Sequence, residues 1–383
     1  MIGLCIKYFH ENYGGMLQAY ATTQIFNKRK LEYEIIRYEK KKDLAFVVKS
    51  IPRVFNNVLI NDKYEALQKK ISMKKHPKLI RNEQIRMNAF HKFRDDKFKK
   101  LSRVYNGYKD LCDGSKKYDV VVTGSDQLWS PAGLPTNFYN LKFVADNVRK
   151  VSYASSFGVK SIPWYQKKRT KEFLDRIDYI SMRENSGKAI VKELTGRDVP
   201  VVLDPVFMFN KEEWENLIPN KKVIEEKYIF AYFLGSNPKY REEVKKLSKI
   251  LGLKIVTLRH LDQYVEADEE FGDYAPYDVG PEEFLSLLRN AEYVFTDSFH
   301  GSVFSIIHKK QFLVFNRYSE TSKHSKNSRI DTLCKNLDLK NCRYDNNIMS
   351  IIEKPINYNG IDVKLENMKN EANLYLDQAL NLN

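Results

Sequence analysis

Short apolar runs alternate with amphipathic stretches along most of this chain, and the alternation predicts strands and helices in turn. Gly3 to Tyr8 is typical of a buried strand, the apolar residues from Met16 to Ile25 recur at helical spacing, and Glu34 to Tyr38 is typical of a second strand. Such an opening indicates a parallel sheet with helices on its faces. The same pattern predicts further strands at residues 118–122, 151–158, 179–182, 199–203, 228–234, 254–258, 293–296 and 312–316.

The strand–helix pattern occurs in two successive halves. We therefore expect the α/β class, with two Rossmann-like domains that face a cleft. Residues 1–204 are predicted to form the N-terminal domain and residues 205–360 the C-terminal domain, with Asp204-Pro205 as the junction. Residues 361–383 form a predicted helix with one apolar side, which we expect to pack back on the body.

Residues 39–117 interrupt the alternation and carry most of the positive charge. The formal net charge of the chain is +15, and this segment holds 22 Lys and Arg against 9 Asp and Glu. We interpret it as a basic helical insertion, with an acidic partner and a merely solvated face as equal alternatives. Within it, Leu44 to Ile60 has one apolar face, for which core packing is favoured over a membrane interface. No recognition motif accompanies the charge, so no nucleic-acid partner is expected.

The composition narrows the class of protein further. No apolar run approaches the roughly 18–20 residues that a membrane-spanning helix needs. The start has no basic segment or cleavage site of a secretory signal. The four cysteines are scattered without a CxxC pair, so neither a zinc site nor a disulfide framework is predicted. The acidic residues at 268–273 are interpreted as a solvated loop. We expect a cytoplasmic protein without a bound metal.

The stretch Tyr293–Lys310 combines a short strand, a polar turn at Asp297–Gly301 and the apolar face of a helix. This unit directs backbone N–H groups and the positive end of a helix dipole at an anion. A histidine in the turn, His300, can donate or accept a proton near neutral pH. We therefore expect an acidic, phosphate-bearing substrate here, with His300 beside the bond that changes. The alternative is a histidine that only bonds the turn backbone.

Polar residues follow three other predicted strands. Asn12 and Gly14 would let a ligand approach the backbone, unless they serve the turn alone. Asp126 is placed to act as a base or to bind a sugar hydroxyl, or else it caps the next turn. Arg183 can grip a carboxylate or phosphate with two hydrogen bonds, or else it pairs with Glu184. The remaining histidines singled out, which we expect to be structural or surface residues, are His10, His260, His308 and His324.

Blocks of this sequence resemble the polysaccharide pyruvyl transferases and occur in that family's order over about residues 3–330. The blocks are Asn12-Tyr13-Gly14 with Leu17–Tyr20, Gly124–Trp129, Ser152–Gly158, Arg183-Glu184, Leu203–Pro205 and Thr296–Gly301. The resemblance implies a fold similar to GT-B glycosyltransferases. It also implies transfer of a pyruvyl group from phosphoenolpyruvate to a hexose of a surface polysaccharide or its precursor, with formation of a ketal and no cofactor.

The resemblance further implies which residues hold the donor. Arg183 and His300 match the family's donor-binding groups, and Ser298, Phe299 and Gly301 surround the histidine. Some relatives carry an arginine where this chain has Ser298. Another cation is therefore expected to help hold the donor, and the candidates are Arg329, Arg317 and Lys323.

The same resemblance assigns the remaining roles. His300 is the expected acid and Asp126 the expected base. The acceptor is expected to be a sugar, an oligosaccharide or a lipid-linked sugar, and the basic segment at 39–117 would then contact the inner face of the membrane. The residues expected to contact the acceptor are Asn12, Tyr13, Gly14, Ser125 and Gln127.

Two other functions compete with this interpretation. A GT-B glycosyltransferase would hold the diphosphate of a nucleotide sugar at the same helix terminus. A non-catalytic module that binds acidic polymer would rely on residues 39–117 alone.

Overall fold

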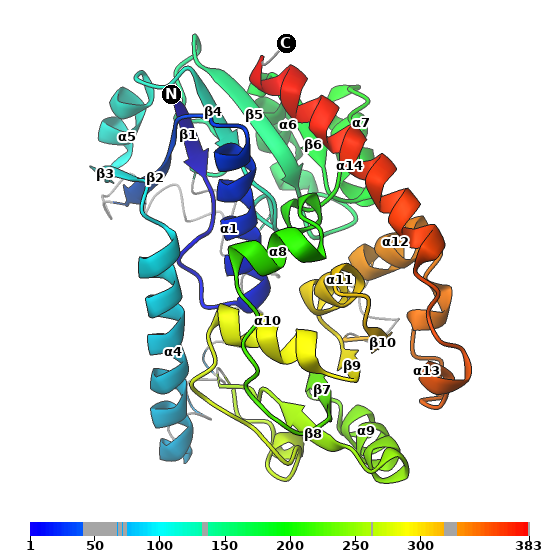
Figure 1. The fold of residues 1–383 in the computed structure, drawn as a ribbon. Helices are drawn as coiled ribbons and strands as arrows, with labels where there is room; N and C mark the ends of the chain where they lie inside the picture. The colour runs from blue at the N-terminus through cyan, green and yellow to red at the C-terminus, as the bar shows by residue number, and fades with distance from the viewer. Residues whose placement is uncertain are drawn as a thin grey trace.

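The computed structural model describes residues 1–40, 67, 71, 75–131, 137–261, 263–317 and 328–381. The stretch Leu44–Ile60 and the candidate cation Lys323 lie outside the described residues. Figure 1 shows two α/β parts, one above the other, with both chain termini at the upper part.

In the described ranges, six strands form one sheet in the order β3-β2-β1-β4-β5-β6, and four form a second in the order β10-β9-β7-β8. Every pair of neighbouring strands is parallel. This confirms the predicted fold class of two Rossmann-like halves. The strands are β1 (Ile2–Cys5), β2 (Tyr33–Glu39), β3 (Leu101–Asn106), β4 (Val120–Thr123), β5 (Arg149–Ser155), β6 (Tyr179–Met182), β7 (Tyr228–Tyr232), β8 (Lys254–Thr257), β9 (Tyr293–Thr296) and β10 (Gln311–Val314).

Helices connect these strands and cover the sheets (Figure 1). The α-helices are α1 (Tyr13–Lys28), α4 (Pro77–Lys97), α5 (Tyr108–Ser115), α6 (Trp164–Arg176), α7 (Asn185–Thr195), α8 (Lys211–Leu217), α9 (Pro238–Leu251), α10 (Pro281–Asn290), α11 (Phe299–Ile307), α12 (Ser328–Asn336), α13 (Ser350–Glu353) and α14 (Asn359–Leu380). Short 3₁₀ turns are η3 (Pro205–Met208), η4 (Glu266–Asp268) and η5 (Lys340–Cys342).

The apolar sequence of β7 shows why a strand in this position has no polar face. Successive side chains of a strand point to opposite faces of the sheet. Tyr228, Phe230 and Tyr232 accordingly join the large core that continues into the N-terminal half, whereas Ile229 and Ala231 join the core beneath α9. Because both faces are covered, all five residues are buried.

An aromatic cluster fixes the two halves against each other. The ring of Tyr13, from the first turn of α1, stacks on Phe284 of α10 at 4.7 Å and lies 4.7 Å from the ring of Phe90. Its hydroxyl donates a hydrogen bond to the carbonyl oxygen of Val279. Stacked rings contribute about 0.5–1.5 kcal/mol beyond the burial of their area. The cluster therefore orders the interface that builds the pocket described below.

Helix α4 crosses from the N-terminal half to the C-terminal half (Figure 1). Arg86 donates hydrogen bonds to the carbonyl oxygens of Arg259 and Pro276, and Lys97 pairs with Glu282 at 2.7 Å. These contacts tie the basic segment to the second domain as well as to the first.

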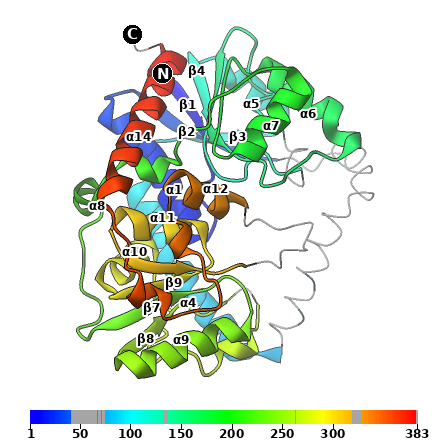
Figure 2. The ribbon, with the colours of Figure 1, turned by 90° about the vertical axis from the view of Figure 1, so that its right-hand side faces the viewer.

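The C-terminal helix α14 returns to the N-terminal half, as Figure 2 shows. The hydroxyl of Tyr375 donates to the carbonyl oxygen of Ser152 in β5, and Arg29 of α1 donates to Asn373 and Asp377. The expectation that this helix packs back on the body is confirmed.

Two local predictions differ from the structure. The part of the basic segment that we expected to be helical contains β3, an edge strand whose Ser102 and Tyr105 are buried. The strand expected at residues 199–203 makes only a single bridge between Val201 and Met182. Pro200 has no N–H to donate, so this segment cannot continue a ladder of hydrogen bonds.

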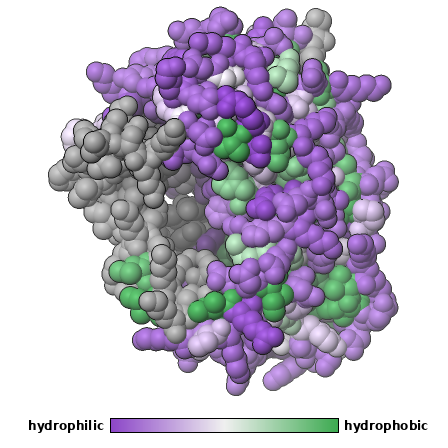
Figure 3. Space-filling view, turned by 90° about the vertical axis from the view of Figure 1, so that its left-hand side faces the viewer, coloured by the Kyte–Doolittle hydropathy of each residue, from purple (hydrophilic) through white to green (hydrophobic). Residues whose placement is uncertain are grey.

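The surface shows no sign of a membrane-spanning element in the described ranges, where no helix is both long and apolar enough to cross a bilayer. The face seen in Figure 3 is mostly hydrophilic where described residues form it, and its hydrophobic side chains stand in small separate groups.

His308 anchors the far end of α11 in the core. It is buried, and its Nε2 accepts a hydrogen bond from Nε of Arg289 in α10 at 3.2 Å. Burial, with the nearby charges of Arg289, Lys211 and Lys310, lowers the pKa of His308 from 6.5 to about 2. The ring is therefore neutral in the folded protein.

We expect this histidine to make the protein less stable in acid. Above pH 6.5 the ring is neutral in both states; below it the unfolded chain binds a proton that the folded chain does not, so stability falls as the pH falls. The free energy of unfolding should fall by roughly 1.4 kcal/mol for each pH unit below 6.5, which amounts to about 2 kcal/mol at about pH 5. Urea unfolding of wild type and His308→Gln measures it, since the glutamine still accepts from Arg289 but does not titrate. Equal pH dependence in both proteins would contradict this assignment.

Candidate functional site

The strand order of the first sheet brings two loops together. The chain reverses direction of winding between β1 and β4, and ligands of open parallel sheets bind beyond the carboxyl ends of the strands at such a point. Lys7, His10 and Asn12 follow β1, and Asp126 and Gln127 follow β4. The residues after β1 and those after β4 are more than a hundred positions apart in the sequence, yet all five line one pocket.

The second sheet contributes its own reversal point, between β7 and β9. Leu234 follows β7 and Asp297 follows β9, and both line the same pocket. The two reversal points therefore face each other across the interface between the domains. The pocket has a volume of about 220 Å³, and its other lining residues are Gly15, Ser298, Phe299, His300, Arg317, Arg329 and Ile330.

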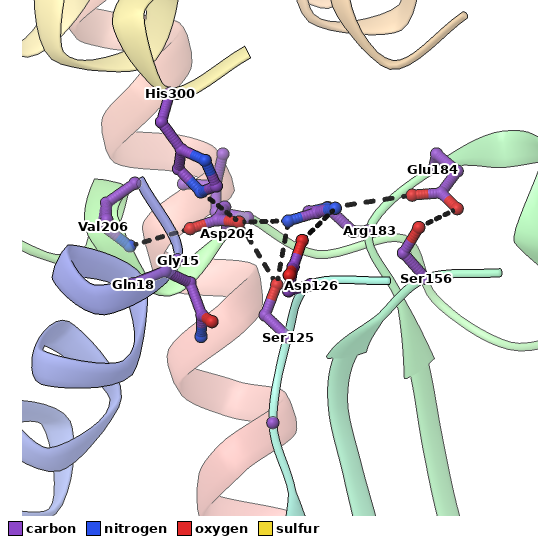
Figure 4. A network of polar contacts seen from close by, with 12 residues as sticks. Gly15, Gln18, Ser125, Asp126, Ser156, Arg183, Glu184, Asp204, Val206 and His300 are labelled. Carbon is purple, nitrogen blue, oxygen red and sulfur yellow. Dashed lines mark hydrogen bonds and ion pairs between the residues drawn. The ribbon is translucent and has the colours of Figure 1, made fainter. Parts of the chain in front are cut away.

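A buried carboxylate, that of Asp204, lies where the two domains meet (Figure 4). Its Oδ2 accepts from Nη1 of Arg183 at 2.7 Å and from the hydroxyl of Ser125 at 3.2 Å. Its Oδ1 accepts the backbone N–H of Val206, which caps η3. Nε2 of His300 lies 3.7 Å from Oδ2, within the range of an ion pair but long for a hydrogen bond.

The charge of Asp204 is stabilised by these neighbours. Burial alone would raise its pKa, but the facing His300 and Arg183 outweigh burial and hold the pKa well below its ordinary value of 3.8. Asp204 therefore stays ionised.

Arg183, which we expected to bind the donor, does not line the pocket. Its side chain is only 3% exposed, and it faces three carboxylates: Asp204 at 2.7 Å, Asp126 at 3.7 Å and Glu184 at 3.8 Å. The salt bridge to Glu184 that we considered as the alternative is thus part of a larger network. Arg183 is therefore the internal counter-ion of these three carboxylates and lies behind the residues that line the pocket.

Asp126 has the backbone geometry of a constrained functional residue. Its φ of 75° is left-handed, a conformation that costs a non-glycine residue on the order of 1 kcal/mol. The backbone is held there because Leu128 and Ser156 donate their N–H groups to its carbonyl oxygen. Burial would raise its pKa, but the charges of Arg183, His300, Arg329 and Lys7 lower it below 3.8. The carboxylate is therefore ionised and suited to accept hydrogen bonds.

His300 lies in the first turn of a helix rather than in the turn that the sequence predicted. Helix α11 begins at Phe299 because the side chain of Ser298 caps it by accepting the N–H of Gly301. The N–H groups of Phe299 and His300 have no partner within the helix, so the terminus can bind an anion. The expected anion-directed helix terminus is present, although the N–H of Gly301 is used by the cap.

Gly14 of α1 packs directly against His300 across the domain interface. A Cβ atom built on Gly14 would overlap the imidazole, with Cβ of His300 only 2.5 Å away. Gly14 therefore does not line the pocket as an acceptor contact, and its lack of a side chain leaves room for the histidine ring.

Permanent cations face the pocket from both domains. Among its described lining residues, Lys7 comes from the N-terminal domain, and Arg317 and Arg329 come from the C-terminal domain. The guanidinium groups of Arg183 and Arg329 lie 5.0 and 5.4 Å from the centre of the Phe299 ring. The negative face of the ring attracts both cations. Asp297 adds a carboxylate, but its two oxygens accept the N–H groups of Leu234 and Gly235.

The predicted acceptor contacts separate into two groups. Asn12 lines the pocket while its side chain caps α1 by accepting from Gly15, and Gln127 lines it with an Nε2 that has no partner among the described residues. Tyr13 is buried in the aromatic cluster, and Ser125 is buried against Asp204. The latter two, like Gly14, support the pocket from behind.

The sequence reasoning gave no role in this site to Lys7, His10 or Asp204. Asp204 was interpreted as a domain junction, although its block in the family pattern was a signal for a role. His10 was expected to be structural or at the surface; it is exposed, and it also lines the pocket. Its position directly after β1 was the available signal.

Acidic and histidine side chains do not gather into a metal site. Within the described ranges, no group of three or more His, Cys, Asp or Glu side chains is arranged to hold a metal ion.

Comparison with known proteins supports both the family and the fold. A family model described as polysaccharide pyruvyl transferase matches residues 12–319, which is most of the chain. A search of curated proteins found no match.

Solved structures share the architecture at low sequence identity. UDP-GlcNAc 2-epimerase from Neisseria meningitidis, bound to UDP-GlcNAc, is 12% identical with a TM-score of 0.50, and the match covers 100% of both chains. UDP-GlcNAc 2-epimerase from Methanocaldococcus jannaschii is 13% identical with a TM-score of 0.45, over 87% of this chain and 90% of that chain. The glycosyltransferase SnogD from Streptomyces nogalater is 10% identical with a TM-score of 0.44, over 100% and 99%. Such likeness concerns the GT-B-like fold alone.

We predict that Asp204→Asn destabilises the protein by about 3 kcal/mol, because it leaves the buried guanidinium of Arg183 without its nearest counter-charge. Urea unfolding gives the difference. The matched control is Asp175→Asn, which removes the same charge from an exposed pair with Lys171 and should cost less than about 1 kcal/mol. Equal free energies of unfolding in the two variants would show that the Asp204–Arg183 pair contributes no more to stability than an exposed ion pair does.

Proposed function

Because this chain belongs to the polysaccharide pyruvyl transferase family, we propose that it moves a pyruvyl group from phosphoenolpyruvate to two hydroxyls of a hexose unit, forming a pyruvate ketal. The observation that carries the proposal is the convergence of a histidine, three cations and a helix N-terminus on one small pocket.

The charges of the pocket fit a small donor with two anionic groups. Phosphoenolpyruvate carries a carboxylate and a phosphate, and each needs cations or N–H donors in exchange for water. Among the cations that line the pocket, Arg317 and Arg329 come from the same domain as α11, and Lys7 faces them from the other domain. Arginine is suited to bidentate contact with either group. We assign the donor to these three residues and to the N-terminus of α11.

His300 is the proposed acid. Its proton goes to the methylene carbon of phosphoenolpyruvate, which leaves positive character on the neighbouring carbon. A hexose hydroxyl forms a bond to that carbon, and its proton restores His300. A second hydroxyl then forms a bond to the same carbon as the carbon–oxygen bond to phosphate breaks, and the proton of this hydroxyl leaves with the phosphate as hydrogen phosphate. Oδ2 of Asp204 lies 3.7 Å from Nε2 of His300.

Asp126 is the proposed partner of the attacking hydroxyl. It lines the pocket on the N-terminal side together with Asn12 and Gln127, opposite the cations of the C-terminal domain. Its lowered pKa makes it a weak base, so its main contribution is to accept the hydrogen bond that orients the hydroxyl. The acceptor sugar is therefore assigned to this side of the pocket.

The function is tested by incubating the protein with phosphoenolpyruvate and a panel of hexose-containing acceptors. We expect one phosphate released for each pyruvylated acceptor seen by mass spectrometry. His300→Ala should lower turnover by about 10²–10⁴-fold, the usual contribution of a positioned acid. It should leave the fold intact, because an alanine removes no partner of Asp204 other than this distant contact.

Two outcomes would contradict the assignment. Full activity of His300→Ala would remove the histidine from the mechanism. Transfer of a sugar from a nucleotide sugar, with no consumption of phosphoenolpyruvate, would favour the competing glycosyltransferase.

We predict that Gly14→Ala lowers turnover by roughly 10²-fold, because the added methyl group displaces the His300 imidazole and a misplacement of about 1 Å has this effect on catalysis. The control is Gly360→Ala in the first turn of α14, where an added Cβ meets nothing within 4 Å. This control should keep full turnover. A Gly14→Ala enzyme with wild-type turnover would show that the packing between α1 and His300 does not position the ring.

A further inference from the structure

A second cavity of about 380 Å³ lies beyond the wall of the first pocket. It forms between the start of α4 and the loop that follows β8, so both halves of the chain line it. The carboxyl end of β8 is a usual place for a ligand in a parallel sheet. The proposed transfer of the pyruvyl group makes no use of it.

The loop holds a histidine in a fixed orientation. Nδ1 of His260 lies 2.7 Å from Oδ2 of Asp268, and Oδ1 of Asp268 pairs with Arg241 at 2.6 Å. The side chain of His260 is only 6% exposed, and its Nε2 has no partner among the described residues. A buried ring held by a carboxylate, with its other nitrogen unused in the wall of a cavity, is arranged to meet a ligand.

Independent features of this cavity favour an anion. It is lined by Lys75, Lys78 and Arg259, and Nε of Arg259 has no partner among the described residues. Helix α4 is 21 residues long, and its N-terminus opens here without a side-chain cap. Pro77 has no N–H and Leu79 donates its N–H to the carbonyl oxygen of His76, so this terminus contributes mainly the partial positive charge of the helix dipole. The carboxylates of the lining are Glu269 and Asp268, and the latter is balanced by Arg241.

The cavity also offers flat ring surfaces. His76 stacks on Tyr264 with ring centres 3.8 Å apart and planes at 5°, and Tyr277 lines the cavity beside them. Such rings suit the faces of a sugar or a base. The stacked pair comes from different halves of the chain, so it also closes one end of the cavity.

A continuous wall of hydrogen bonds separates this cavity from the first pocket. Asp297, which lines the first pocket, accepts the N–H of Gly235, and the carbonyl oxygen of Gly235 accepts from Arg241. Arg241 in turn holds Asp268 and, through it, His260. A ligand in the second cavity and the reacting groups in the first are thus held by one set of contacts.

We propose that the second cavity binds a ligand that carries a phosphate or diphosphate group beside a sugar or base ring. This anion site stands on its own contacts and does not depend on the proposed function. His260, Lys78 and Arg259 meet the phosphate oxygens, and the aromatic pair meets a ring attached to them.

The anion site is tested by calorimetric titration with inorganic pyrophosphate in the presence of excess phosphoenolpyruvate. Lys78→Gln and Arg259→Gln should each weaken pyrophosphate binding by about tenfold, the loss expected for one charge-assisted contact. Lys246→Gln on α9 removes an equal charge that is 66% exposed and paired with Glu243, and it should bind as wild type does. His260→Ala is the third variant; the two charge variants make the test valid even if that loop fails to fold.

The outcomes separate the two proposals. Pyruvylation of acceptors with unaltered pyrophosphate binding in both charge variants would overturn the second site alone. Pyrophosphate binding that the variants weaken, with no acceptor pyruvylated, would overturn the proposed function and leave the anion site in place.

Discussion

The carboxylate of Asp204 faces the guanidinium of Arg183 on one side and the imidazole of His300 on the other. A buried charge is tolerated only where opposite charges and hydrogen bonds replace the lost water. Arg183 belongs to the first domain and pairs with Asp204 directly, whereas His300 approaches the same carboxylate from the second domain. The buried charge pair therefore lies where the docking of the two halves assembles the pocket.

This arrangement divides the cations of the site into two classes. Arg183 is surrounded by three carboxylates behind the wall, whereas Lys7, Arg317 and Arg329 line the pocket. The inner pairs fix the geometry of the wall, and the outer cations make the pocket basic. The buried guanidinium of Arg183 is thus balanced by carboxylates, and the positive charge that faces the pocket comes from other residues.

Much of the fold follows from local patterns in the sequence. The continuous apolar run of β7 and the strand–helix unit at Tyr293 are visible in the sequence because each depends on neighbouring residues. Strand β3 was missed because Leu101 to Asn106 alternates only weakly and stands at the edge of the sheet, next to a charged helix. The start of α11 was misplaced because the cap at Ser298 turns polar residues into a first helical turn.

The site was predictable only in part, for a different reason. Strand ends pointed to Asp126 and His300, which both line the pocket, since that rule needs no knowledge of partners. The pairing of Arg183 with Asp204, and the packing of Gly14 on His300, join residues far apart in the chain. No local sequence pattern indicates such a contact. A residue that was predicted to contact the ligand can therefore prove to support the pocket from behind.

The return of α14 to the first domain has a consequence for how the chain is made. Its contacts with Arg29 and Ser152 belong to the N-terminal half, yet they come from residues that follow the whole second domain in the chain. The first domain therefore lacks these contacts until the second domain and α14 have been synthesised. A fragment cut at the boundary between the domains would lack them as well, so the upper half of the molecule would be incomplete as an independent unit.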